Sequence, residues 1–288
     1  MTIVDANSFV VCDNSKVYQF DFTGKFIRHI GAPGRSTYEY LQPMCVRTFN
    51  GSIYVWSSWI PKIIEYNNVG IPIAEYAYSS GVTDFIPTED KIIIYTSGKR
   101  DQNTVDILNK LTGEIEASII PTTALHRLLS KFWSRQPLCV DEKVLYVMRK
   151  DALTIYAYDL TEDHREMSPI TLESDTFLIN DENIKSDRFW EYYCSNSEVV
   201  LLIKAKNGFR ILAREGMLSY EDGSKLNKEK AFYTLYTIRD NKLRKREHYT
   251  AETLPDLSLV SFYDSHIYAL DHSIENDDDV YKLVRVDL

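Results

Sequence analysis

One motif recurs along the chain: an alternating strand, a small turn and a second strand. Copies begin near residues 16, 62, 104, 154, 232 and 280, so the period is roughly 40 to 50 residues with one long interval. That period is typical of β-propeller blades, each of which is one small antiparallel sheet. The sequence therefore predicts an all-β protein, a six-bladed β-propeller of four-stranded antiparallel blades.

The turns inside the repeat support this register. Gly24, Gly70 and Gly113 stand between the two strands of the first three copies, where a positive φ angle favours glycine. Asn50-Gly51 separates two further alternating segments and is a strong signal for a two-residue hairpin. The string QPMCV at 42–46 returns as QPLCV at 136–140, about two periods later. Both observations indicate the same arrangement of blades.

We expect residues 1–288 to form a single propeller domain. A content of 20 Tyr and 12 Phe beside many Val and Ile suits pleated, half-buried strands. The fifth blade is predicted to carry an insertion at about 209–230, because a polar stretch rich in Gly, Ser, Lys and Glu interrupts its strands. A short helix is predicted over Thr122–Lys131, where apolar residues follow Pro121 at helical spacing.

The two ends of the chain are predicted to share one blade. The first residues already read as a strand, which we assign to the middle of a blade, and the sequence ends after the third strand of the last one. Pairing both ends within one sheet would close the ring and remove exposed strand edges. We therefore expect truncation of either end to destabilise the whole ring.

The charge of the chain argues against nucleic acid as a partner. It carries 42 acidic and 33 basic residues, a formal charge of −9, so its surface repels phosphate backbones. The basic strip Arg239–His248 is interpreted as a solvated edge strand, with an anion-binding strip as the alternative. No stretch approaches the roughly 20 apolar residues of a membrane span. We expect a monomer without a transmembrane segment in this chain.

Cysteine and metal-ligand spacing give no chemical motif. The four cysteines lie in or beside apolar strands and lack C-x-x-C spacing, so we predict buried free thiols: Cys12, Cys45, Cys139 and Cys194. The six histidines form no H-x-x-x-H pair, and the acidic run Glu275–Asp279 lacks the pattern of an EF-hand. The sequence predicts no cofactor and leaves open a divalent metal on the channel axis.

About the first 45 residues carry a family resemblance. Its motif residues in the first repeat are Asp13, Val17, Tyr18, Phe20, Asp21, Gly24, Lys25, Phe26, Ile27, Ile30 and Gly31. The linker that follows keeps Gly31, Gly34, Glu39 and Tyr40, but has Ser36-Thr37-Tyr38 where Gly-Pro-Gly is usual. This segment resembles the six-bladed propellers common in Bacteroidetes, relatives of the NHL and TolB-like propellers. The resemblance implies a protein of the periplasm or cell envelope, its signal peptide absent from this chain and its function mostly unassigned; a cytoplasmic location is the alternative.

Candidate binding residues follow from propeller architecture. One mouth of the central channel, formed by loops entering the innermost strands, is the usual functional surface. Aromatic rings beside arginine and carboxylates there would hold a sugar or peptide, whereas inter-blade packing and loop salt bridges are the alternative. The candidates are Arg35, Glu39, Tyr40, Asp84, His126, Trp133, Arg135, Arg188, Trp190 and Glu191.

Two functional classes are compatible with these residues. The first is a non-enzymatic binding module of the cell envelope, which holds a protein, peptide or glycan. The alternative is a metal-assisted hydrolase or lyase resembling lactonases or NHL-type lyases, with Asp84 or Glu191 among the axial ligands. No G-x-S-x-G elbow, P-loop or dinucleotide fingerprint occurs in the sequence. We therefore favour the binding module over an enzyme.

Overall fold

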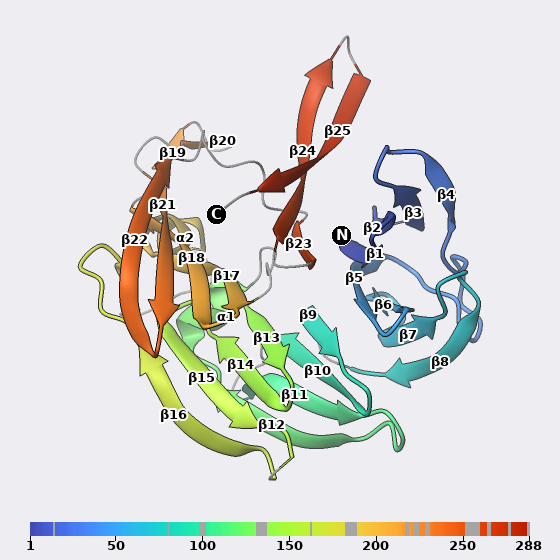
Figure 1. The fold of residues 1–288 in the computed structure, drawn as a ribbon, viewed down its shortest axis with the longest axis horizontal. Coiled ribbons are helices and arrows are strands. Elements are labelled where there is room, and N and C mark those ends of the chain that lie inside the picture. The colour runs from blue at the N-terminus through green and yellow to red at the C-terminus, as the bar shows by residue number, and fades with distance from the viewer. Residues whose placement is uncertain are drawn as a thin grey trace. The chain divides into compact units, whose positions relative to one another are not determined.

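The computed structural model describes most of the chain as antiparallel sheets (Figure 1). The described residues are 1–13, 15–79, 81–97, 102–130, 137–161, 163–181, 189–216, 219–221, 225–227, 231–250, 260–263, 266–275 and 278–286. Within them the strands form five four-stranded sheets, one three-stranded sheet and one two-stranded ribbon. The four-stranded sheets pair their strands in sequential order, as propeller blades do. The predicted all-β propeller fold is confirmed.

The elements follow one another as the repeat predicts. The first sheet is β1 (Thr2–Asp5), β2 (Ser8–Cys12), β3 (Val17–Asp21) and β4 (Phe26–His29). The second is β5 (Pro43–Phe49), β6 (Ser52–Ser57), β7 (Lys62–Tyr66) and β8 (Pro72–Ala77). The third is β9 (Val82–Pro87), β10 (Lys91–Thr96), β11 (Asn103–Asn109) and β12 (Ile115–Pro121). The fourth is β13 (Leu138–Asp141), β14 (Val144–Met148), β15 (Thr154–Asp159) and β16 (Arg165–Thr171).

The last two sheets depart from this regular pattern. The fifth sheet is β17 (Glu198–Ala205), β18 (Gly208–Gly216), β21 (Ala231–Arg239) and β22 (Lys242–Thr250). Its second and third strands are separated by the ribbon β19 (Ser219–Glu221) and β20 (Lys225–Asn227). The last sheet is β23 (Val260–Tyr263), β24 (His266–Glu275) and β25 (Asp278–Val286). Two helices lie between sheets, α1 (Ala124–Leu129) and α2 (Phe189–Ser195).

The chain divides into two compact units, which are described separately. Unit 1 comprises 1–96, 105–119 and 255–288, and unit 2 comprises 97–104 and 120–254. Unit 1 holds the first, second and last sheets with most of the third, and unit 2 holds the fourth and fifth sheets with both helices. Whether residues 1–288 act as one domain stays a prediction.

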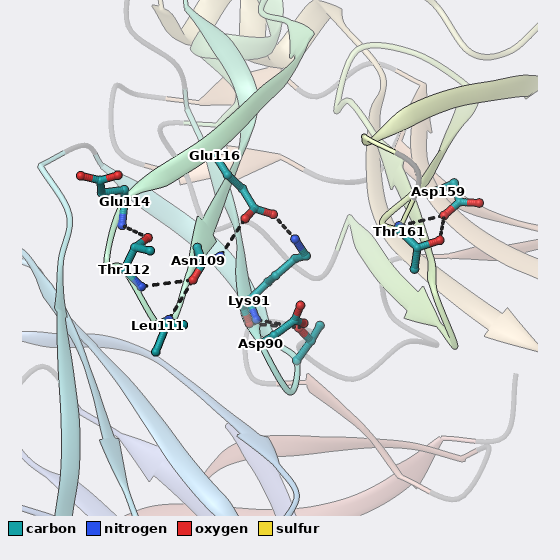
Figure 2. A network of polar contacts seen from close by, with 10 residues as sticks. Asp90, Lys91, Asn109, Leu111, Thr112, Glu114, Glu116, Asp159 and Thr161 are labelled. Atoms are coloured by element: carbon teal, nitrogen blue, oxygen red, sulfur yellow. Dashed lines mark hydrogen bonds and ion pairs between the residues drawn. The ribbon is translucent and has the colours of Figure 1, made fainter.

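The turn that gave the sequence repeat is built by an Asn or Asp side chain. In the third sheet Asn109 Oδ1 accepts hydrogen bonds from the backbone N–H groups of Leu111 (2.9 Å) and Thr112 (3.2 Å) (Figure 2). Asp159 caps the corresponding turn of the fourth sheet through the N–H of Thr161 at 2.8 Å. Asp21 and Asn67 do the same in the first two sheets. These side chains compete for local backbone donors and so end the third strand of each of the first four sheets.

The glycines predicted at this turn have positive φ angles, as expected. The values are +85° for Gly24, +86° for Gly70 and +72° for Gly113. The fourth sheet has no glycine here, and Asp163 and His164 adopt the left-handed conformation instead. Asp and Asn tolerate that conformation better than most residues. The turn therefore persists where its glycine is lost.

Cores form where successive sheets pack face to face within a unit. In unit 1 one apolar cluster joins the first two sheets and a second joins sheets two and three. In unit 2 Ile155, Val199 and Ile211 belong to a single cluster between the fourth and fifth sheets. The outer strands β4, β8 and β12 are largely exposed. The second sheet thus buries both faces of its inner strands.

The first strands of neighbouring sheets lie next to one another. In unit 1, β5 lies beside both β1 and β9, and in unit 2, β13 lies beside β17. The first strand of each sheet is therefore its inner strand within the unit. The binding residues predicted from the sequence were expected on these inner strands and on the loops that lead into them.

The prediction that the two ends share one blade is wrong. β1 is the first strand of a complete four-stranded sheet, and the last three strands form a sheet of their own. These two sheets of unit 1 instead pack together through side chains, including Met1, Ile3 and Leu283. The rings of Phe22 and Tyr268 stack at 5.9 Å between centroids. Apolar packing, rather than strand exchange, joins the described first and last sheets.

The irregular fifth blade and the inserted helix were partly predicted. β18 pairs along its whole length with β21, so residues 208–216 belong to the blade and only 217–230 intervene. The predicted helix at Thr122–Lys131 is confirmed as α1, whereas α2 was not predicted. The basic segment forms β22, the exposed edge strand of its sheet, as expected.

The four cysteines are free thiols, as predicted. Cys194 is buried, and Cys12, Cys45 and Cys139 are partly buried. Desolvation raises the pKa of Cys45 to about 12 and that of Cys139 to about 12. Because the thiolate is the reactive form, these two side chains are poor nucleophiles at neutral pH.

Candidate binding surfaces at the loop ends

Connections in an antiparallel sheet alternate between its two ends. We call the end at which the linker enters the first strand the loop end, and the opposite end the turn end. In the second sheet the linker that enters β5 and the turn between β6 and β7 share the loop end, because Ser58 N–H donates to Gln42 O at 3.2 Å. The turn of Leu111 lies at the turn end, where Lys110 N–H donates to Asp90 O at 2.9 Å. Each sequence-predicted site residue that the structure describes belongs to a loop end or an inner strand.

The linker of unit 1 is held by side chains that reach into its backbone. Tyr40 is fully buried, and its hydroxyl accepts from Val17 N–H at 3.1 Å and donates to Ile30 O at 3.0 Å. Gly31 has a φ of +64°, and a Cβ atom there would lie 2.5 Å from Cζ of Tyr66. The linker glycine that the family motif retains therefore makes room for a ring of the next blade.

The other two predicted linker residues differ: Glu39 stabilises the linker, and Arg35 is exposed. Glu39 Oε2 accepts from the backbone N–H of Ser36 at 2.8 Å, and a Cβ atom on Gly34 would overlap the Glu39 carboxylate. Arg35 is exposed. Of the three predicted linker residues, Glu39 and Tyr40 face the protein and Arg35 faces solvent.

Asp84 is buried on the inner strand β9 and forms an ion pair with Arg47 of β5, which is partly buried. It also accepts from Phe85 N–H at 2.8 Å and contacts the Cys45 thiol at 3.6 Å. Burial raises the pKa of Asp84 despite the neighbouring guanidinium. Asp84 Oδ2 and Arg47 Nε are buried without a hydrogen-bond partner. The structure thus places this candidate apart from the linker, in the inner wall of unit 1.

His126 is fully buried in α1 of unit 2. Its Nδ1 accepts from the backbone N–H of Lys150 at 3.3 Å, so the proton is on Nε2, which lies 3.2 Å from Ser130 Oγ. Thr123 caps the helix through the N–H of His126 at 3.0 Å. The neutral imidazole links α1 to the turn after β14.

A buried ion cluster lies beneath α2. Glu198 accepts from Arg214 Nε at 3.1 Å and from the Tyr193 hydroxyl at 3.2 Å, and Lys150 Nζ lies 3.4 Å from its other oxygen. The Arg214 guanidinium also lies over the Tyr193 ring, 4.8 Å from its centroid. Trp190 packs edge-on against the same ring at 6.0 Å. The cluster positions α2 against β17 and β18.

Trp190 and Glu191 are exposed on α2, and 40% of the Trp190 side chain is accessible. Together with His126 they occupy the helix-bearing loop end of unit 2, so the structure brings these three predicted residues into one region. Trp133, Arg135 and Arg188 lie outside the described residues. Whether any of the predicted residues binds a ligand stays a prediction.

Sequence reasoning missed two exposed aromatic residues at the loop end of the second sheet. Trp59 is 71% exposed in the turn between β6 and β7, and Tyr38 is 37% exposed in the linker. A tryptophan in a polar turn, Ser57-Ser58-Trp59, was the available signal, because such a position is seldom part of a core. Tyr38 also stands where the family motif has glycine, which marks it as a departure.

Sequence reasoning also missed a buried carboxylate in the fifth sheet. Glu215 is fully buried and accepts hydrogen bonds from Thr176 (2.7 Å), Thr234 (2.8 Å) and Tyr236. Among the described residues, no group of three or more His, Cys, Asp or Glu side chains is arranged to hold a metal ion. The described helices include none long and apolar enough to cross a membrane.

Comparison with known proteins finds the fold in Bacteroides structures. One is a protein of Bacteroides fragilis described as exported, with 16% identity, a TM-score of 0.63, and coverage of 92% of this chain and 77% of that one. Another is a member of the duf4221 family from Bacteroides vulgatus, with 11% identity, a TM-score of 0.63, and coverage of 94% and 88%. A Bacteroides caccae protein of unknown function has 12% identity, a TM-score of 0.51, and coverage of 86% and 80%. At these identities the likeness shows the fold alone.

A family model gives a more specific result. Among curated proteins, none matches the chain. A family described as a 6-bladed beta-propeller matches residues 2–167, more than half of the chain. That match includes the first three sheets and most of the fourth. The protein therefore belongs to this family of six-bladed β-propellers.

Proposed function

We propose that the protein is a non-enzymatic binding propeller of the cell envelope, which holds a protein, peptide or glycan at the loop ends of its sheets. One observation carries the proposal: the exposed side chains at these ends include Trp59 and Trp190, whereas three buried groups with catalytic potential are engaged inside the protein. Asp84, His126 and Glu198 are all held by internal partners. Exposed aromatic side chains are typical of recognition surfaces.

The location in the envelope is supported by the structures that share the fold. They include a Bacteroides fragilis protein described as exported. This fits the envelope location that the resemblance of the first repeat implies. An envelope protein without a catalytic task would meet its ligand at an exposed surface, and the loop ends supply one in each unit.

The proposal is tested by changing the loop ends and the turn end separately. Purified full-length protein is applied to glycan arrays, peptide arrays and immobilised envelope protein fractions. A Trp190→Ala/Glu191→Ala variant alters unit 2, a Tyr38→Ala/Trp59→Ala variant alters unit 1, and Leu111→Ala is the control. Leu111 is 94% exposed at the turn end, so its removal should leave binding unchanged.

Loss of a bound ligand in either loop-end variant, with the control unaffected, is the expected result. Equal binding by all three variants would contradict the assignment to the loop ends. Turnover of a lactone or glycan substrate that requires an added divalent metal would instead favour the hydrolase or lyase alternative. Asp84→Asn and Glu191→Gln would then identify the ligands of that metal.

A further inference from the structure

The linker of unit 1 and the turn between β6 and β7 present two exposed aromatic rings from one hydrogen-bonded frame. Trp59 N–H donates to Leu41 O at 3.4 Å, and the Ser57 hydroxyl both accepts from Leu41 N–H (3.0 Å) and donates to Leu41 O (2.9 Å). Tyr38 is only three residues before Leu41, at most about 11 Å of backbone. The frame fixes the Trp59 backbone and leaves its ring to solvent.

Two linker residues adopt a conformation that side chains normally avoid. Tyr38 has a φ of 63° and Gln42 has a φ of 53°, a left-handed conformation that residues other than glycine adopt at a cost in stability. Such a residue persists only where its surroundings hold it, and such residues often lie at functional sites. Neither position is glycine, so each residue adopts this conformation at a cost in stability.

Both residues are held from outside the linker. Tyr38 N–H donates to Glu75 Oε2 at 2.8 Å, and its carbonyl accepts from the Tyr66 hydroxyl at 2.8 Å. Glu75 is fixed in turn by Lys62 at 2.8 Å. The Ser58 hydroxyl donates to Gln42 Oε1 at 2.9 Å. The Tyr38 backbone and the Gln42 side chain are therefore held in place before any ligand arrives.

Three polar groups of the same linker remain available. In the described part of the chain no partner is present for the Tyr38 hydroxyl, the Gln42 amide nitrogen or the Arg35 guanidinium. The free groups are thus a phenol, an amide and a cation on the linker, which is hydrogen-bonded to the turn that carries Trp59. Together with the exposed rings they offer both stacking and hydrogen bonding.

We propose that Tyr38, Gln42, Trp59 and Arg35 form a carbohydrate-binding surface for an oligosaccharide. The aromatic faces would cover the apolar C–H faces of sugar rings, while the phenol, amide and guanidinium bind hydroxyl and acidic oxygens. A protein partner normally covers about 800 Å² on each side around an apolar centre. Two exposed rings on one hydrogen-bonded frame that also carries free polar groups fit a chain of sugars better. This inference rests on the proposed function and names its ligand class.

The test uses the full chain in native affinity gels that contain soluble polysaccharides: a neutral β-glucan, a mannan, a xyloglucan and a polygalacturonate. At least one should retard the wild-type protein, and calorimetry with its hexasaccharide should give the dissociation constant. Trp59→Ala should weaken binding about 30-fold, as expected for a central tryptophan, and Tyr38→Phe should have a smaller effect because it removes only the hydroxyl. Leu111→Ala is the matched control, and circular dichroism reports the fold of each variant.

Two results would overturn the inference. One is that none of the four polysaccharides retards the wild-type protein. The other is that Tyr38→Ala/Trp59→Ala binds as the wild type does. If sugar binding is lost only in Trp190→Ala/Glu191→Ala, the surface is misplaced while the proposed function stands. If these residues bind a peptide instead, the ligand class is wrong, and only the absence of every ligand contradicts both proposals.

Discussion

The loop ends of the two units are stabilised in different ways. In unit 1 the linker into β5 depends on backbone conformation: a glycine beside Tyr66, left-handed residues, and hydroxyl groups such as that of Tyr40 that bind main-chain atoms. In unit 2 the corresponding region contains α1 and α2 (Figure 1), with a buried carboxylate, Glu198, between two cations beneath them. The first loop end depends mainly on hydrogen bonds to main-chain atoms, and the second on a buried ion cluster.

This difference teaches where each loop end is vulnerable. A backbone-built linker is sensitive to added volume and to loss of a single hydroxyl group. An ion-built loop end is sensitive to loss of one charge, because the remaining buried charges cannot be solvated. The variants below separate the two cases, from the largest expected effect to the smallest.

Removal of the central carboxylate in unit 2 should have the largest effect. Glu198→Ala leaves Arg214 and Lys150, each with a side chain only 4% exposed, without this partner. We expect a loss of about 3–5 kcal/mol in the free energy of unfolding, measured by chemical denaturation. Glu191→Ala on the exposed face of α2 should change it by less than about 0.5 kcal/mol. A Glu198→Ala loss below 1 kcal/mol would show that the ions do not support the helices.

Added volume should be the main weakness of the unit 1 linker. Gly31→Ala places a Cβ atom against the Tyr66 ring at a φ of +64°, so conformational strain and overpacking together should cost about 2–4 kcal/mol. Gly24→Ala is the matched control, since its φ is +85° and nothing lies within 4 Å. The control should cost only about 1–2 kcal/mol. Equal losses would mean that the close approach of Tyr66 is unimportant.

Loss of one hydroxyl should weaken the same linker to a smaller degree. Tyr40→Phe keeps the buried ring but removes both the acceptor for Val17 N–H and the donor to Ile30 O. The expected destabilisation is about 1–3 kcal/mol. Relative to the wild type, the variant should show a larger increase in hydrogen-exchange rate at Val17 and in the linker than in the fourth and fifth sheets. Unchanged protection at Val17 would contradict this role.

The smallest effect should be a pH dependence of the free energy of unfolding, caused by the Glu75 carboxylate that accepts from Tyr38 N–H. Burial pushes the pKa of Glu75 upward, but Lys62 and Tyr38 N–H outweigh it and hold that pKa below its ordinary value of 4.5. A depressed folded-state pKa gives stability that is present above the unfolded value and is lost as pH falls through the folded one. Glu75 is partly exposed, so the contribution is below about 1 kcal/mol. Glu75→Gln should make the free energy of unfolding vary less with pH below pH 4.5. An unchanged dependence on pH in this range would contradict the stabilising role of Glu75.

Much of the fold could be predicted because its signals are local. The turn glycines Gly24, Gly70 and Gly113 and the hairpin at Asn50-Gly51 report backbone angles that few other residues adopt, and all have positive φ. The exposed edge strand β22 followed from its charge pattern. The wrong prediction concerned closure, since strand exchange and face-to-face packing leave the same alternating pattern at the two ends of a chain.

The candidate site could be predicted only in outline. Trp190, Glu191 and His126 lie on the helices that precede β13 and β17, and the burial of His126 follows from its contacts with the turn after β14. Trp59 and Tyr38 were missed because exposure of an aromatic ring depends on neighbours distant in sequence. Glu39 and Tyr40 were proposed to face a ligand, yet they brace the linker.

The sequence by itself determined the repeat, the all-β propeller and the positions of its turns, because each depends on residues within a few positions of one another. Only the tertiary structure decided which polar groups are occupied. Asp84 reaches Arg47 across two inner strands, and Glu198 reaches Lys150 over 48 positions of sequence. Such pairs are set by how sheets pack rather than by local pattern. The side chains available to a ligand are those that remain exposed and unpaired after the sheets pack. The sequence alone therefore could not identify them.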